Sequence, residues 1–249
     1  MQGYVNLFEQ LEHEGYCVLP RALEASAVDT MRKRVVANLG IMGNTRPNSA
    51  SRHLAGFHRY PTLEPLHQMM TSNGDLIDAL TEVYKPANFI TIGLADITVN
   101  RSQPWHTDLL RGKYARFLSP EMCWGEQGGG CLKALLYLQN GKSLKVVPGS
   151  HLTQLPLSDD KFTIPTENQT VQSVEVQVGD IVLMDIRLIH RGSTEEDMQA
   201  ENLAIDPKIL VSIVFGAQGA PLTHAMQVGN AHRMVEWDAL HLTSGSLVR

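Results

Sequence analysis

Cysteines are few in this sequence, and a long apolar run is missing from it. Cys17, Cys123 and Cys131 form an odd, widely spaced set, which excludes a disulfide framework and gives no zinc-finger spacing. No stretch of about 18 apolar residues occurs, so we expect no membrane span. Residues 1–14 lack a basic region followed by an apolar block, so we expect no signal peptide. These absences favour a soluble protein in a reducing compartment, the cytoplasm.

A basic surface is also missing. The formal net charge is −5 and the isoelectric point is about 6.0, which argues against broad binding to nucleic acid. Hydrophobic residues make up 43% of the 249 residues, enough for a sizeable core. Because we find no repeat, low-complexity tract or linker, we expect one domain that covers residues 1–249.

The order of the predicted elements is helices first and strands later. Helical spacing of apolar residues predicts helices before Gly15, over 22–36 and over 66–84, with a short strand at 16–19. The polar segment 39–61 is predicted to be a long loop. Strands with turn residues between them are predicted over 89–99, 129–138, 144–147, 171–178, 181–184 and 209–215. This pattern predicts a mainly β jelly roll with flanking N-terminal helices.

The segment Trp105-His106-Thr107-Asp108 holds the residues that point most directly to chemistry. On a strand, His106 and Asp108 would project to the same face, as two adjacent ligands of a metal. His190, which follows an apolar strand, is the best candidate for a third ligand. Two histidines and one carboxylate suit ferrous iron and leave positions open for oxygen and a cosubstrate. A lone His-x-Asp pair is more often a surface or structural feature, so the pair is informative only in its context.

That context resembles the phytanoyl-CoA dioxygenase family of iron(II)- and 2-oxoglutarate-dependent oxygenases. The resemblance runs from about Phe8 to Phe215. Its segments occur in the family's order, and they are residues 14–20, 105–108, 134–138, 140–151, 179–185 and 190–193. No single motif is decisive, but together and in this order they are specific.

The resemblance implies a double-stranded β-helix, also called a jelly roll or cupin-like fold, in which His106, Asp108 and His190 bind Fe(II) and act in catalysis. It also implies 2-oxoglutarate as cosubstrate and O2 as oxidant, with succinate and carbon dioxide formed as a C–H bond of the substrate is oxidised. Hydroxylation is the default outcome; desaturation, ring closure or epimerisation are departures from it. Because Asp108 is present, no position is vacant for a halide, which related halogenases require.

Three residues are expected to bind the cosubstrate. The family usually has an arginine on the strand after the second metal histidine, and Lys208 occupies that place here. A lysine can neutralise the far carboxylate of 2-oxoglutarate, but it lacks the two-pronged geometry of arginine. Ser193 could contact the same carboxylate or cap a turn, and Gln103 could donate a hydrogen bond near the pocket.

The sequence leaves the substrate open. We expect a small molecule, with no nucleic-acid or membrane partner, and the oligomeric state is not indicated. The acidic segment from Thr194 to Asp206 would attract a cationic or amino-bearing substrate if it covered the pocket, although acidic runs are usually solvated. Two alternatives remain: a metal-dependent cupin-like isomerase or oxygenase that uses no 2-oxoglutarate, and a non-catalytic binding protein on the same scaffold.

Overall fold

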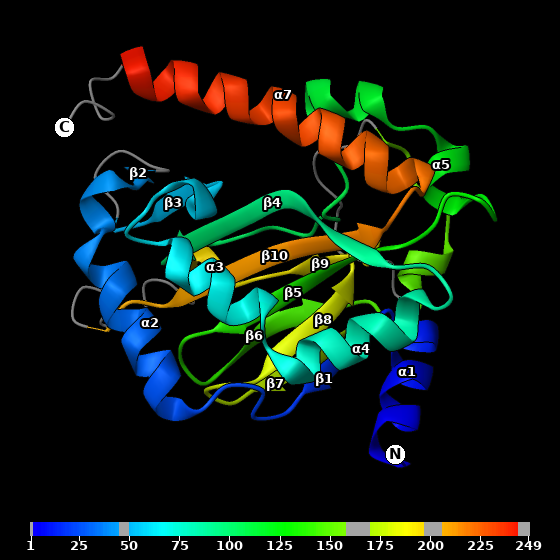
Figure 1. Ribbon diagram of the computed structural model, residues 1–249, viewed down its shortest axis with the longest axis horizontal. Coiled ribbons are helices and arrows are strands. Elements are labelled where there is room, and N and C mark those ends of the chain that lie inside the picture. The colour runs from blue at the N-terminus through cyan, green and yellow to red at the C-terminus, as the bar shows by residue number, and fades with distance from the viewer. Residues whose placement is uncertain (1, 45–49, 158–169, 197–205, 244–249) are drawn as a thin grey trace.

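The computed structural model describes residues 2–44, 50–157, 170–196 and 206–243 of the chain. Two antiparallel β-sheets lie at its centre, with helices on the outer faces (Figure 1). The larger sheet has seven strands in the order β1-β8-β5-β10-β4-β3-β2, and the smaller sheet has three in the order β7-β6-β9. The strands of the larger sheet are β1 (Tyr16–Leu19), β8 (Ile181–Asp185), β5 (Cys131–Tyr137), β10 (Ile209–Ala217), β4 (Phe89–Val99), β3 (Arg52–Ala55) and β2 (Gly43–Asn44).

The smaller sheet faces the larger one across an apolar interior. Its strands are β7 (Gln172–Val176), β6 (Gly141–Val146) and β9 (His190–Arg191). Leu144, Val146 and Val174 from the smaller sheet share one buried cluster with Val182 and Met184 from β8. A jelly roll closed in this way was predicted, and the mainly antiparallel sheets confirm that fold class.

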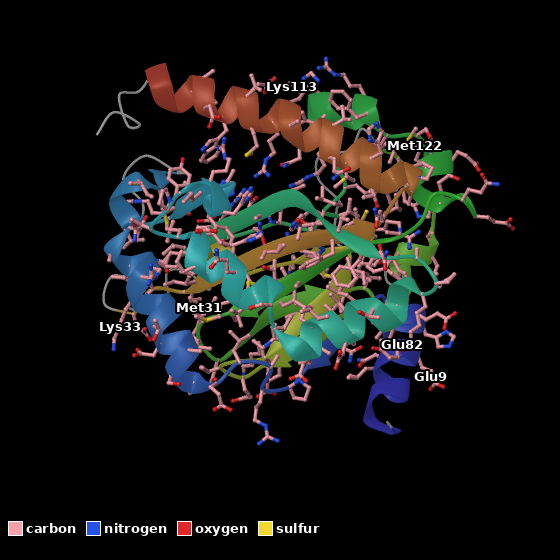
Figure 2. The ribbon with its side chains drawn as sticks, viewed as in Figure 1. Glu9, Met31, Lys33, Glu82, Lys113 and Met122 are labelled. Atoms are coloured by element: carbon pink, nitrogen blue, oxygen red, sulfur yellow. The ribbon has the colours of Figure 1, made fainter. Side chains whose placement is uncertain are left out.

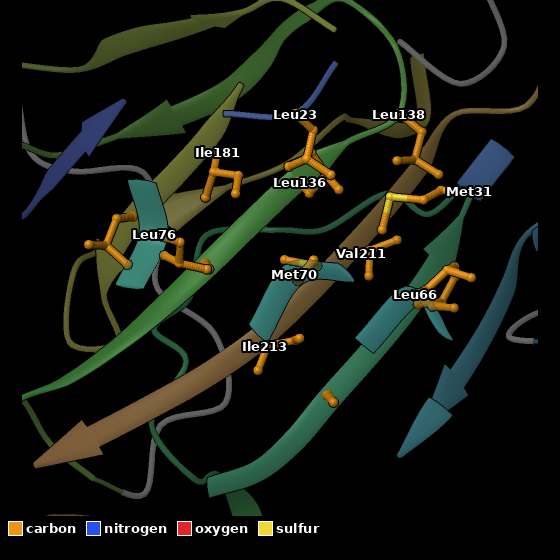
Figure 3. Packing of buried hydrophobic residues seen from close by; sticks show 14 of the residues in the cluster. Leu23, Met31, Leu66, Met70, Leu76, Leu136, Leu138, Ile181, Val211 and Ile213 are labelled. Atoms are coloured by element: carbon orange, nitrogen blue, oxygen red, sulfur yellow. The ribbon is translucent and has the colours of Figure 1, made fainter. Parts of the chain in front are cut away.

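The opposite face of the larger sheet is covered by helices from the first third of the chain. Since side chains alternate along a strand, Ile181 and Leu183 point away from the interior and pack with Leu136 against this helical layer. Figure 3 shows the layer, in which Met31, Leu66, Met70 and Leu76 lie over the outward side chains of β5, β8 and β10. The covering helices are α2 (Ala25–Ala37), α3 (Glu64–Thr71) and α4 (Gly74–Tyr84).

The outer surfaces of these helices are charged. On α2, Met31 is fully buried whereas Lys33 is exposed and pairs with Asp29 one turn earlier, and Figure 2 shows Lys33 at the periphery. One face of α2 is thus apolar and buried and the other charged and exposed, as in an amphipathic helix at a surface. None of the described helices is long and apolar enough to cross a membrane.

Two turns near the first strand need residues without a Cβ. Gly15 ends α1 (Gln2–Glu14) as predicted, with φ of +84°, and a Cβ there would lie 2.6 Å from Nδ1 of His151. Gly179 has φ of +92°, and a Cβ would lie 2.2 Å from the carbonyl oxygen of Leu23. Both backbone conformations favour glycine, so these turns fix how α1 and β8 meet β1.

Several sequence predictions differ from the structure. The helix predicted over 66–84 is two helices, because the chain turns at Ser72 and Asn73 and the Asn73 side chain caps α4 by accepting a bond from the Leu76 N–H. The loop predicted over 39–61 contains β2 and β3, and the helical turns η1 (Leu39–Ile41) and η2 (Phe57–Arg59). Polar composition hid β3, whose backbone is satisfied by pairing with β4. Residues 45–49 of that segment lie outside the described part.

The longest helix was not predicted at all. Helix α7 (Pro221–Thr243) follows the last strand and crosses over β4 in the upper part of Figure 1. Its buried residues Leu222, Ala225 and Met226 pack with Ile92 and Val214. The remaining elements are η3 (Gly112–Phe117), α5 (Pro120–Trp124) and η4 (Ser150–Leu152), of which η3 and α5 contact α7.

The contact between the larger sheet and the helical layer is testable at Leu136. Its side chain is fully buried on β5, so we expect Leu136→Ala to lower the free energy of unfolding by about 3 kcal/mol through lost contacts and the cavity left behind. Urea denaturation measures this. Leu152→Ala is the matched control, because Leu152 is 65% exposed and its loss should change stability by less than about 0.5 kcal/mol. Equal effects of the two substitutions would contradict the packing described.

Candidate metal centre

A pair of backbone hydrogen bonds holds His106 next to His190. The N–H of His106 donates to the carbonyl of His190 at 2.8 Å, and the N–H of His190 donates to the carbonyl of His106 at 2.9 Å. His190 opens β9, while His106 pairs with it as an isolated bridge outside any named strand. The ring centroids are 4.2 Å apart. The two histidines predicted as ligands are therefore brought together by the backbone.

Each imidazole ring is oriented by a local carbonyl. Nδ1 of His106 lies 2.7 Å from the carbonyl oxygen of Pro104, and Nδ1 of His190 lies 2.9 Å from that of Leu188. A carbonyl oxygen only accepts, so Nδ1 carries the proton in both neutral rings. Nε2 of each ring is then unprotonated and available to a metal, an arrangement that is common around metal-bound histidines.

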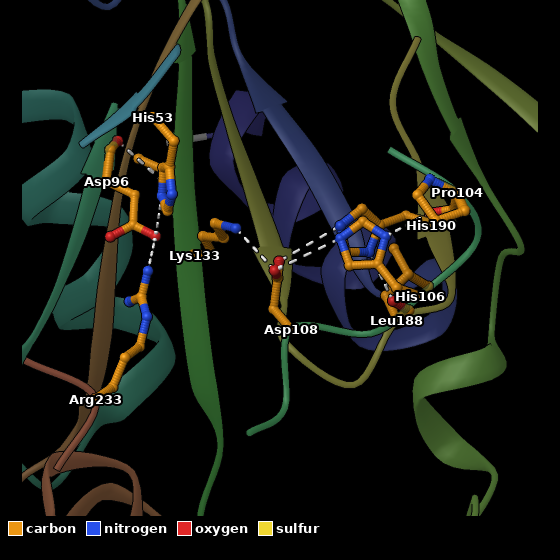
Figure 4. Close-up of polar contacts among 10 residues, drawn as sticks. His53, Asp96, Pro104, His106, Asp108, Lys133, Leu188, His190 and Arg233 are labelled. Atoms are coloured by element: carbon orange, nitrogen blue, oxygen red, sulfur yellow. Dashed lines mark hydrogen bonds and ion pairs between the residues drawn. The ribbon is translucent and has the colours of Figure 1, made fainter. Parts of the chain in front are cut away.

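Asp108 completes the set. Its N–H donates to the carbonyl of Ile186 at 2.8 Å, which places the carboxylate beside both rings. Oδ2 lies 3.4 Å from Nε2 of His190, and Oδ1 lies 3.9 Å from Nε2 of His106 (Figure 4). The ligand atoms of the three residues all lie within 4.8 Å of one another.

One carboxylate oxygen of this set lacks a hydrogen-bond partner. Oδ2 of Asp108 is buried and has no hydrogen bond among the described residues. A buried carboxylate oxygen without a partner is costly, and a divalent cation would satisfy it. Two imidazole nitrogens and a carboxylate oxygen, with space left on one side, are the ligand set that ferrous iron takes in oxygenases. The residues present therefore fit the predicted metal.

The charges of the three residues suit a metal ligand set. Burial lowers the pKa of His106 well below its ordinary value, and the neighbouring His190 lowers it further. Burial also lowers the pKa of His190. Burial raises the pKa of Asp108, but Lys133 and the two histidines lower it more, so the net pKa lies below the ordinary value. Near neutral pH the site thus presents two neutral rings and one carboxylate.

Lys133 is a residue of the site that was not predicted from the sequence. It lies on β5, and its Nζ is 2.8 Å from Oδ1 of Asp108. Both side chains are 13% exposed. A signal was present, since Lys133 is the one charged residue in the apolar strand Cys131–Tyr137, and a lysine inside such a strand needs a buried partner.

The three metal residues open onto a cavity of about 300 Å³. Gln103, one of the three residues predicted to bind the cosubstrate, lines this cavity. Ser193 and Lys208 do not; they line an adjoining hollow of about 40 Å³ that Gln103 also reaches. The cavity and the hollow share six lining residues, which are Thr98, Arg101, Gln103, Tyr137, Gly192 and Leu210.

A second buried cluster lies across the cavity from the metal residues. Asp96 on β4 accepts hydrogen bonds at Oδ2 from Nη2 of Arg233 at 2.6 Å and from Nε2 of His53 at 3.2 Å (Figure 4). His53 belongs to the segment predicted as a loop, but it lies on β3 and is 8% exposed. Arg233 comes from α7. The cluster therefore ties the C-terminal helix to the larger sheet at the wall of the cavity.

Residues next to the metal ligands make structural contacts. Trp105 is buried with Val147 and Ile189. Arg187 pairs with Asp185 at 2.6 Å and donates to the carbonyl of Cys123, so this pair does not contact His190, whose ring is oriented by the Leu188 carbonyl.

One protein-family model matches the part of the chain that contains these residues. The family model described as phytanoyl-CoA dioxygenase (PhyH) matches residues 96–196, which include all three metal residues. The expected family resemblance is confirmed. The family match and the ligand set identify an iron(II)- and 2-oxoglutarate-dependent dioxygenase-type enzyme, with the cofactors that the resemblance implied. No curated protein sequence matches the chain.

Solved structures share the fold at low sequence identity. The epimerase SnoN from nogalamycin biosynthesis aligns with a TM-score of 0.65 and 17% identity, covering 87% of this chain and 84% of SnoN. The carbocyclase SnoK from nogalamycin biosynthesis gives 0.59 and 19%, covering 85% and 83%. HygX from Streptomyces hygroscopicus, with nickel and 2-oxoglutarate bound, gives 0.58 and 16%, covering 86% and 87%. At these identities the likeness establishes the fold.

The metal assignment is testable by binding. We expect His190→Ala to weaken binding of Fe(II), or of Ni(II) as an oxygen-stable substitute, by at least about 100-fold, because loss of a ligand should cost no less than loss of a residue that orients one. Anaerobic calorimetry measures the dissociation constant. His224→Ala is the control, since His224 is an exposed histidine on α7. Unchanged affinity in His190→Ala would exclude His190 as a ligand.

The Asp96 cluster predicts a dependence of stability on pH. Burial raises the pKa of Asp96, but Arg233 and His53 lower it more, so the folded pKa lies below the unfolded value. Asp96→Asn should lower the free energy of unfolding by about 2–3 kcal/mol near neutral pH, because Arg233 loses its buried partner. A depressed pKa stabilises above the unfolded pKa, so the difference from wild type should shrink below about pH 4.

Urea denaturation at a series of pH values measures this difference. Asp29→Asn is the control, because Asp29 pairs with Lys33 at an exposed position and should contribute little at any pH. A difference that grew on acidification would mean that Asp96 is not held as a carboxylate.

Proposed function

We propose that the protein oxidises a C–H bond of a small molecule, with 2-oxoglutarate as the cosubstrate, as one step of small-molecule metabolism. The observation that carries the proposal is the placement of two neutral imidazoles and one carboxylate at the wall of a cavity. Iron(II) bound there would supply activation of oxygen, with decarboxylation of the 2-oxo acid. Hydroxylation, ring closure, desaturation and epimerisation all begin with removal of a substrate hydrogen atom, so the same site serves each.

The part played by the chain is to hold the ligand atoms and limit access. The carbonyls of Pro104 and Leu188 keep Nε2 of both rings directed at the metal, so the rings need not reorient when it binds. Leu109, Leu110 and Leu135 make part of the cavity wall apolar. Such a wall restricts water around the reacting groups.

The adjoining hollow is where we place the far carboxylate of 2-oxoglutarate. Ser193, Gln103 and Lys208 line it together, although they come from three separate segments. The N–H of Gln103 donates to the carbonyl of Ser193 at 3.0 Å, which holds two of these segments together. We therefore keep all three residues as contacts of the cosubstrate.

The charges on the cavity wall indicate which substrate charge would be favoured. Four cations and two carboxylates line it, namely Arg101, Arg111, Lys133, Arg233, Asp96 and Asp108. Iron(II) and a doubly charged 2-oxo acid would add no net charge. The surplus of cations favours a substrate with an anionic or hydroxyl group over the cationic substrate considered from the sequence. That earlier expectation rested on an acidic segment of which residues 197–205 lie outside the described part.

The relatives support a small-molecule substrate in general terms. SnoN has been solved with nogalamycin RO, and HygX with hygromycin B. Both are small molecules of moderate size. The three cysteines Cys17, Cys123 and Cys131 are free and buried, in keeping with our proposal of one domain that works in the cytoplasm.

The proposal is tested by product formation. Iron(II)-loaded protein with 2-oxoglutarate and oxygen should form succinate slowly even without substrate, and Asp108→Ala should abolish this by removing a metal ligand. Succinate is measured by mass spectrometry. Asp78→Ala, an exposed carboxylate on α4, is the matched control and should leave the rate unchanged. No succinate from protein with iron bound would favour the alternative, metal-dependent chemistry without a 2-oxo acid.

A further inference from the structure

The cations around the metal cavity differ in what they contact. Lys133 pairs with Asp108 and Arg233 pairs with Asp96. Arg101, in contrast, makes no side-chain hydrogen bond or ion pair with any residue that the structure describes, although it lies near other charges of the cavity. Arg101 is partly buried, and a partly buried guanidinium without a carboxylate partner loses hydration that a bound carboxylate would offset.

Arg101 lies where the two spaces meet. It lines both the cavity that contains the metal residues and the adjoining hollow that contains Ser193. Lys208, the residue that the sequence pattern favoured, lines the hollow but not the cavity. A ligand that spans from the metal residues into the hollow must therefore pass Arg101.

The backbone around Arg101 is held on both sides. Asn100 has φ of +49°, and its N–H donates to the carbonyl of Lys208 while its Oδ1 accepts from the N–H of Lys208, both at 2.8 Å. Two residues after Arg101, Gln103 is bonded to Ser193. These two bonds stabilise the left-handed conformation at Asn100. That conformation sets the direction of the chain that leads through Arg101 to His106.

Arg101 has limited exposure to solvent, so its guanidinium loses part of its hydration. Burial lowers the pKa of its guanidinium; Asp96 and Asp108 raise it, and Arg111 and Arg233 lower it. The guanidinium is thus poorly solvated, and no described carboxylate forms an ion pair with it. A carboxylate bound by both prongs of the guanidinium would restore hydrogen bonds and charge balance at once.

We propose that Arg101 binds the far carboxylate of the 2-oxo acid, so that the anion-binding arginine has moved from the late strand to the segment that precedes the first metal histidine. The inference rests on the proposed function. Lys208 contributes charge from the wall of the hollow, but as a point charge it binds the carboxylate less strongly than a two-pronged guanidinium. The substitution of lysine on the late strand is thereby explained, because the arginine is supplied from elsewhere.

The experiment compares two 2-oxo acids that differ only in the far carboxylate. Anaerobic iron(II)-loaded protein is titrated with 2-oxoglutarate and with 2-oxopentanoate, and dissociation constants come from the visible charge-transfer band of the chelate. The wild type should prefer 2-oxoglutarate. Arg101→Gln should weaken 2-oxoglutarate about 100-fold, the scale expected when one partner of a buried charge pair is removed, and leave 2-oxopentanoate within about threefold.

Three further variants make the result specific. Lys208→Met should weaken 2-oxoglutarate by less than about tenfold. Arg116→Gln, at an exposed arginine of η3, should change neither ligand. Arg101→Lys keeps the charge and loses the two-pronged geometry, so it should give an intermediate preference; it also tests the proposal if Arg101→Gln does not fold. Circular dichroism and iron content confirm that each variant is folded and loaded.

The outcomes separate the two proposals. If the wild type prefers 2-oxoglutarate and Arg101→Gln keeps that preference, the assignment of Arg101 is wrong while the proposed function stands. The same holds if the preference collapses in Lys208→Met, or in a Lys133→Met variant, but not in Arg101→Gln. If the wild type binds iron but neither 2-oxo acid, both the proposed function and the role of Arg101 are overturned.

Discussion

The reciprocal backbone hydrogen bonds between His106 and His190 are the constraint on which the site depends. They join residues far apart in the sequence, and β6 fixes the second of them through the pairing of Val146 with His190. The next contact of the same kind, from the Asp108 N–H to the Ile186 carbonyl, brings in the carboxylate. The three ligand atoms thus converge because the backbone is paired around the mouth of the barrel. A metal that binds there would meet ligand atoms that backbone pairing already orients.

Alternation along the strands explains why the sequence predicted this much. Apart from Lys133 and Asp185, the residues of β5 and β8 are mostly apolar, since one face of each strand meets the barrel interior and the other meets α2, α3 and α4. Such runs, separated by turn residues, are typical of strands buried on both sides. The metal motif was predictable for another reason. A His-x-Asp pair is ambiguous alone, but here a later histidine and the other segments of a jelly-roll family accompany it. His106 and Asp108 nonetheless converge without a regular strand, which is why strand geometry alone was an incomplete argument.

The parts that could not be predicted depend on contacts between distant segments. Helix α7 has no regular apolar stripe, since it lies partly on η3, partly on β4 and partly on α5. The strand β3 is hidden in a polar segment because its partner β4, and not its own composition, makes it a strand. Likewise, nothing in the spacing of Lys133, Arg101 or Arg233 shows that they face one cavity. That depends on the register between β4, β5 and β10 and on where the last helix lies.

The residues that could be predicted and those that could not also lie in different parts of the chain. The family match ends at residue 196, and within it lie the metal residues, Lys133 and Arg101. Arg233 lies beyond it, on a helix that the larger sheet holds through Asp96. The chemistry therefore belongs to the shared part of the chain, whereas the wall that faces the metal across the cavity is supplied by a later part. Since Asp96 is on β4 and its partner is on α7, a change in α7 would alter the shape and charge of that wall without moving a metal ligand. Selection of the substrate can vary in this fold while the oxidation step stays the same.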